Sequence, residues 1–121
     1  MTTIATRRAE LTAALIAGGV SCTDTPGDAQ PPYAILVQAG SDLDGIGRGQ
    51  VAFGWRVTLV AGDYLVATSA TALDSLMSTS TTVLRLMDGW RLTSMSAASI
   101  RDLAGGLYLT ADVTASAMID L

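Results

Sequence analysis

The chain lacks histidine and lysine altogether, and it has one cysteine, Cys22, among its 121 residues. Without histidine it is missing the commonest general base and the commonest zinc ligand of proteins. A single cysteine can form no internal disulfide, and Cys22 has no basic neighbour in the sequence that would favour its reactive thiolate form. We therefore expect a protein of a reducing compartment that is not an enzyme and holds neither a metal nor a cofactor.

Positive charge is also scarce. Seven arginines face eleven acidic residues, which gives a formal net charge of −4, and this balance does not indicate a surface for nucleic acid or for anionic membranes. No segment reaches the roughly 20 apolar residues of a membrane-spanning helix. Arg7 and Arg8 precede an apolar stretch as in a secretion signal, but Glu10 and Thr12 interrupt that pattern. We expect no membrane partner.

The segment from Val51 to Ala61 has an apolar residue at every second position, which predicts a long β-strand. One face of this strand is a row of mostly large apolar residues that must be buried against other elements. The other face is less apolar and carries Arg56 and Thr58. The apolar row consists of Val51, Phe53, Trp55, Val57, Leu59 and Ala61.

Helical patterns lie on both sides of this strand in the sequence. The first predicts a helix from about Thr3 to Ala17, capped by Thr2 or Thr3 and stopped by Gly18 and Gly19.

The second pattern predicts a helix from about Tyr64 to Met87. The serines and threonines at positions 78–82 are poor helix formers, so we expect a break or kink near Thr79. Its apolar stripe comprises Val66, Ala70, Leu73, Leu76, Met77, Ser80, Val83, Leu84 and Met87.

Further strands are predicted before and after these helices. A short strand is possible at 20–25, and the run from Tyr33 to Gln38 should pair antiparallel with Val51–Ala61 across a glycine-rich loop, Gly40 to Gly49. Trp90 to Leu103 alternates loosely, Gly105-Gly106 predicts a hairpin turn, and Leu107 to Leu121 alternates to the last residue.

The element order predicts a single domain, residues 1–121, of the α+β class. We expect a mostly antiparallel sheet of four to five strands, with two helices packed on one face.

The layout also resembles that of the tail terminator, or tail-completion, proteins of long-tailed bacteriophages. The resemblance spans the whole chain. The shared features are an N-terminal helix ending in Ala-Gly-Gly-Val, the strand entry PPYAILV, the aromatic strand FGWRVTLVA, a central helix with Leu73, Leu76 and Met77, and the final strand GGLYLTADVT.

This resemblance implies a structural role in the virion, at the neck-proximal end of the tail, for a protein made in the host cytoplasm. Members of the family form a closed ring, expected to be a hexamer, that caps the tail tube, ends its polymerisation and provides the surface on which the head docks. The implied partners are further copies of the chain, the tail tube protein and the head-tail connector protein. Genomic DNA would pass through the ring without specific binding.

Two groups of residues are candidates for this role. Tyr33, Ile35 and Val37, together with the last strand, are the expected subunit interface, because strand faces and sheet edges are suitable material for a ring. Asp42, Asp44 and Arg48 lie in the glycine-rich loop, which we expect to face the lumen or a partner, or to be a solvent-exposed loop without a role. In the lumen, the two aspartates would repel DNA phosphates. The spacing Asp42-x-Asp44-Gly45 matches only the opening of a calcium loop.

Other classes of protein remain as alternatives. The first is a head-to-tail connector of the phage neck. The second is a small α+β ligand-binding domain or an enzyme, which would have to use scattered residues such as Ser21, Cys22, Tyr33, Arg56 or Asp63. The third is a toxin or immunity-type protein that binds one unrelated partner.

Overall fold

The computed structural model describes residues 2–23, 31–41, 49–63, 65, 67–103 and 105–120. Within these ranges the chain forms an α+β fold, as predicted, with six strands where four to five were expected. The helices are α1 (Ile4–Ala17) and α2 (Thr68–Leu86). The six strands are β1 (Cys22–Thr23), β2 (Tyr33–Gly40), β3 (Gln50–Asp63), β4 (Trp90–Met95), β5 (Ser99–Leu103) and β6 (Gly106–Asp120).

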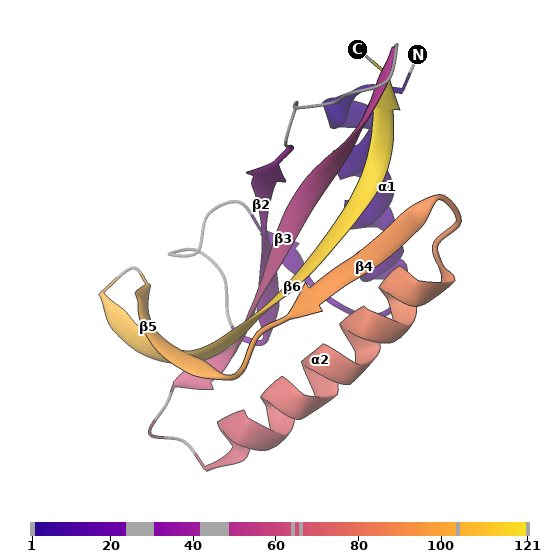
Figure 1. Cartoon of the computed structure of the whole chain (residues 1–121). Coiled ribbons are helices and arrows are strands. Elements are labelled where there is room, and N and C mark those ends of the chain that lie inside the picture. Colours follow the sequence, from indigo (N-terminus) through magenta and orange to yellow (C-terminus); the bar gives the residue numbers. More distant parts are fainter. Residues whose placement is uncertain are drawn as a thin grey trace.

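The sheet is ordered β1-β2-β3-β6-β4, and β5 pairs with β6 beyond the end of β4. All of its pairs are antiparallel except β1 with β2. The predicted pairing of β2 with β3 is confirmed, with Tyr33 opposite Val60. The two long central strands, β3 and β6, run side by side from Gln50 opposite Asp120 to Asp63 opposite Tyr108 (Figure 1).

The segment from Trp90 to Leu103 forms two strands where the loose alternation suggested one. β4 pairs with β6 as far as Met95 opposite Val113, and β5 begins with Ser99 opposite Thr110. At the junction the Asp112 amide donates to the Ser96 hydroxyl at 2.8 Å, and residues 96–98 belong to neither strand. The hairpin turn is displaced by one residue from its predicted place, since Leu103 pairs with Gly106 and Gly105 occupies the turn with a φ of 85°.

The predicted apolar row of β3 is buried in the core, with Trp55, Val57 and Leu59 completely inaccessible. Paired residues of neighbouring strands point to the same side of a sheet, so this row continues onto β6 through Ala111, Val113 and Ala115. Both helices cover this side, because they contribute Leu11, Leu15, Leu73, Leu76 and Leu84 to the same cluster.

The predicted ends of α1 are confirmed. The Thr3 hydroxyl accepts a hydrogen bond from the Thr6 amide at 3.1 Å, and Gly19 leaves the helix with a φ of 94°. Gly18 lies against α2, since a Cβ atom at this position would come within 2.5 Å of Val83 Cγ2. The glycine therefore allows the two helices to approach closely.

The predicted break in α2 is wrong, because the helix is continuous through its serine and threonine run. The Thr81 hydroxyl donates to the Met77 carbonyl at 2.8 Å, and the Thr82 hydroxyl donates to the Ser78 carbonyl at 2.8 Å. These bonds to carbonyls one turn back let the hydroxyl groups stay within the helix without competing for its amides. The helix begins at Thr68, later than predicted.

Neither helix in the described part of the chain is long and apolar enough to cross a membrane.

Replacing Ser80 with alanine should stabilise the protein by about 1 kcal/mol. The Ser80 hydroxyl is completely buried in the core side of α2 and has no hydrogen-bond partner among the described residues. Alanine removes that desolvated group. Urea unfolding would measure the gain, with Ser78→Ala as the control, because Ser78 is exposed on the same helix and gives the same gain in helix propensity alone. A variant no more stable than Ser78→Ala would contradict the prediction.

Candidate functional site

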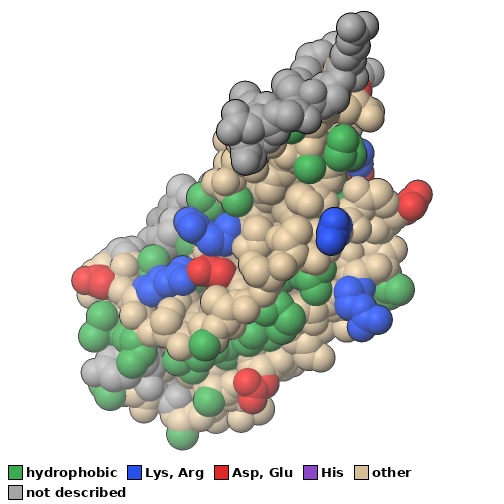
Figure 2. All heavy atoms as spheres, viewed as in Figure 1, with side chains coloured by type: hydrophobic (Ala, Val, Ile, Leu, Met, Phe, Trp, Pro, Cys, Tyr) green, Lys and Arg blue, Asp and Glu red, His purple; other side chains and the backbone are tan. Residues whose placement is uncertain are grey.

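The side of the sheet that the helices leave open is a candidate interaction surface. Register places Ile35, Thr58 and Asp112 side by side across β2, β3 and β6 on this side, with Val37 beside Arg56 in the next row. Figure 2 views the molecule from this side and shows basic and acidic side chains grouped on it. We call it the open face.

The residues predicted to form the subunit interface lie on the open face, and they differ in exposure. Ile35 and Val37 are partly exposed, whereas Tyr33 is only 2% exposed. Burial, together with nearby Tyr108, raises the pKa of the Tyr33 hydroxyl. Of the three, only Ile35 and Val37 offer surface to a partner in this conformation.

The other predicted site residues, Asp42, Asp44 and Arg48, lie outside the described residues. Their role in a lumen-facing or partner-facing loop stays a prediction.

A charged cluster on the open face connects β5 to β6 and β3. Arg101 of β5 reaches back to Asp112 of β6 and binds both carboxylate oxygens, with one bond of 3.1 Å from Nη1 to Oδ1. The Thr58 hydroxyl donates to the same Oδ1 at 2.8 Å. Arg101 pairs with Tyr108, and Asp112 lies four residues farther along β6, so this ion pair ties β5 diagonally to the neighbouring part of β6. Thr110 and Val60 are completely buried in this part of the sheet.

The ion pair should make stability depend on pH in the acidic range. Burial alone would raise the pKa of Asp112, but hydrogen bonds from Arg101 and Thr58, with the charges of Arg101 and Arg56, lower it below its usual 3.8. A lowered folded-state pKa stabilises the fold above the unfolded value, and this contribution is lost as the pH falls through the folded value. Urea unfolding at pH 7 and at pH 3 should show Asp112→Asn losing less stability on acidification than the unsubstituted protein. Equal losses would contradict this.

A second candidate surface lies on the opposite side of the curled end. We call β5 with the paired part of β6, residues 99–103 and 106–110, the arm. On the arm, Leu109 continues the apolar row of the core, and Leu107 extends it past the end of the helical cover, where it is 45% exposed. Ile100, paired with Leu109, is 55% exposed. Figure 2 shows hydrophobic side chains gathered at this end of the molecule.

The arm surface was not predicted as a site. Alternation assigned Leu107 and Leu109 to the apolar side of the last strand, but it could not show that the helices end before that side is covered. A mismatch between a long apolar strand and the shorter helix cover is the signal that points to it.

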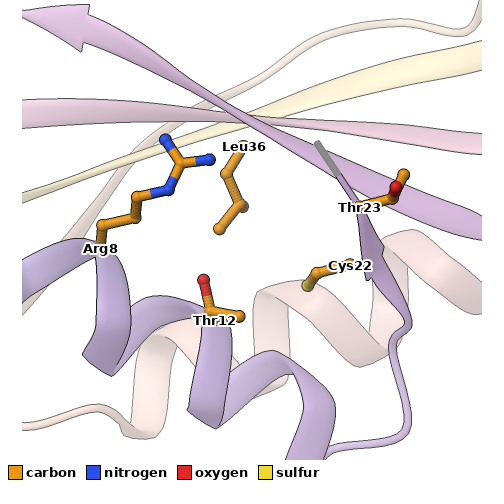
Figure 3. Close-up of a pocket in the computed structure, with 5 residues that line it drawn as sticks. All are labelled: Arg8, Thr12, Cys22, Thr23 and Leu36. Atoms are coloured by element: carbon orange, nitrogen blue, oxygen red, sulfur yellow. The ribbon is translucent and has the colours of Figure 1, made fainter. Parts of the chain in front are cut away.

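The hollows of the molecule contain few ionisable or nucleophilic side chains. Figure 3 shows one of about 110 Å³, which is lined by Arg8 and Thr12 of α1, Cys22 and Thr23 of β1, and Leu36 of β2. The Arg8 guanidinium also lies 5.8 Å from the centre of the Trp55 ring. A wider, open hollow of about 470 Å³ lies beside Asp63 and Tyr108.

The five residues considered for an enzyme or ligand-binding domain lie in three parts of the molecule. Ser21 and Cys22 are neighbours at β1, and Tyr33 and Arg56 are on the open face. Asp63 lies at the end of β3. Among the described residues, no group of three or more cysteine and acidic side chains is placed to hold a metal ion.

No family model and no curated protein matches this chain. Its function therefore has to be inferred from its surfaces and from the resemblance of its layout.

Proposed function

We propose that this protein is a structural virion protein of the tail terminator type, which assembles into a ring that caps the tail tube, ends its polymerisation and offers the surface on which the head docks. The element order that motivated this resemblance is accompanied by surfaces suited to assembly. The expected partners are further copies of the chain, the tail tube protein and the head-tail connector protein.

The observation that carries the proposal is the uncovered apolar side of the arm. Ile100 and Leu107 project from a strand pair that is held in place by the Arg101 to Asp112 ion pair. Proteins that act as monomers rarely leave a contiguous apolar surface on a fixed element, and such surfaces mark contacts with other proteins. Self-assembly through the arm explains why this side is apolar and uncovered.

The open face provides a second surface for the same assembly. It combines the aliphatic side chains of Ile35 and Val37 with the exposed guanidinium of Arg56. Arginine beside apolar side chains is a composition typical of protein interfaces. In this proposal the face on which the sequence placed the subunit interface meets the tube or the head connector instead, and the arm, which includes part of the last strand, makes the contacts between copies.

Capping of tail tubes tests this function. Purified protein added to tubes during their polymerisation should stop growth and appear at one end of each tube in electron micrographs. Binding along the whole tube, or no binding, would contradict a terminator. Binding to the head connector with no effect on tubes would favour the neck connector, and a stoichiometric small molecule in native mass spectra would favour the ligand-binding class.

A further inference from the structure

The exposed surfaces of the molecule differ between the two ends of α2. The arm lies at the beginning of this helix, because Tyr108 of the arm pairs with Asp63, only five residues before Thr68. Leu86, at the other end of α2, lies about 27 Å from Thr68 along the helix axis, at a rise of 1.5 Å per residue. Figure 1 shows the arm and the C-terminal end of α2 on opposite sides of the molecule.

The arm end is apolar and acidic. Asp102 pairs directly with the exposed Leu107 and is itself exposed. Asp63 and Asp74 add two further exposed carboxylates near the start of α2. Among the described residues of this end, the cation is Arg101, and its charge is already matched by Asp112.

The opposite end is apolar and basic. Leu86 is 81% exposed, which is the largest exposure of any large apolar side chain described. Arg85 precedes it on α2, and Asp88 is an exposed carboxylate two residues beyond it. Arg91 is exposed at the start of β4, where its pairing with Ser116 places it on the open face. In Figure 2 a basic and a hydrophobic side chain lie next to each other at the right-hand edge, over this end of α2. We call residues 85 and 86 the basic end.

We propose that the arm of one copy docks on the basic end of the next copy. In this contact Ile100 and Leu107 pack against Leu86, and Asp102 faces Arg85. The inference rests on the self-assembly in the proposed function and names the two surfaces that carry it.

Charge decides between this arrangement and a symmetric one. If two arms packed against each other, Asp102 of both copies would meet in an apolar contact, and like charges there oppose association. Docking on the basic end replaces that repulsion with attraction. Because the two surfaces differ and lie at opposite ends of α2, each copy keeps one of them free, so that repeated contacts close into a ring when the rotation permits.

Two variants, each with one surface destroyed, test this geometry. Leu107→Glu damages the arm and Leu86→Glu damages the basic end. Each variant alone should remain monomeric over a concentration series in analytical ultracentrifugation. Mixed in equal amounts, they should form a complex of two chains that grows no further, because the intact arm of one meets the intact basic end of the other.

The outcomes separate this inference from the proposed function. The inference is overturned if the mixture forms no complex, or if either variant alone assembles like the unsubstituted protein. If the unsubstituted protein forms a ring in that case, self-assembly stands and only the assigned surfaces fail. Ile16→Glu is the control, since Ile16 is 56% exposed on α1 and lies outside both surfaces. It should assemble normally, and circular dichroism should show all three variants folded.

Exchange of charge gives an independent readout. Asp102→Arg alone and Arg85→Asp alone should each weaken assembly, and the chain that carries both substitutions should recover it. Failure of the double variant to exceed both single variants would contradict the contact between these two residues.

Discussion

Replacing Trp55 with alanine is expected to cost the protein a large share of its stability. Trp55 is completely buried at the centre of the sheet, and its ring lies edge-on to Phe53 with 5.4 Å between centroids. Truncation of a buried tryptophan removes about 3–5 kcal/mol, whereas small domains have a total stability of about 5–15 kcal/mol. Urea unfolding followed by circular dichroism would measure the loss.

Arg56→Ala is the matched control for this substitution. It changes the adjacent residue of the same strand, which is exposed on the open face, and surface changes of this kind usually shift stability by less than about 0.5 kcal/mol. A Trp55→Ala variant as stable as Arg56→Ala would show that the apolar row of β3 does not form the core described.

Replacing Asp112 with alanine should release the arm without unfolding the rest of the sheet. The substitution leaves Arg101 and the Thr58 hydroxyl without their shared acceptor. The Asp112 side chain is 17% exposed and that of Arg101 is 35% exposed, so solvent screens part of the attraction. After this discount we expect a local loss of about 1–2 kcal/mol, which corresponds to roughly five- to thirtyfold faster amide exchange.

Hydrogen exchange read by mass spectrometry would locate this effect. Exchange should increase in the arm, residues 99–103 and 106–110, and should stay unchanged in the central part of β3. Asp74→Ala is the control, because Asp74 is an exposed carboxylate on α2, outside the arm. Equal exchange in the two variants would mean that the Arg101 to Asp112 pair does not hold the arm.

The central strand and the class of fold follow from sequence because burial on one side leaves a strict period of two. Trp55, Val57 and Leu59 all proved to be core residues, and the helices that cover them gave their own periodic patterns. The prediction of a break in α2 was wrong because helix propensity does not show whether hydroxyl groups can bond to carbonyls of the preceding turn. Those of Thr81 and Thr82 do so.

The surfaces were harder to predict because they depend on how the elements end. Leu107 is exposed because β6 extends past the point where α2 begins. Tyr33 is buried on the open face, where the curl of the sheet brings Tyr108 near it. The ion pair between Arg101 and Asp112 connects residues whose partnership becomes visible only once the register of β5 on β6 is known.

The mass of the purified protein in solution, measured by light scattering over a concentration series at two salt concentrations, tests self-assembly most directly. We predict a closed ring of fixed mass, expected to be a hexamer, which weakens as salt screens the contact between the acidic arm and the basic end. A monomer at every concentration, which assembled tail tubes also fail to recruit, would contradict the proposed function.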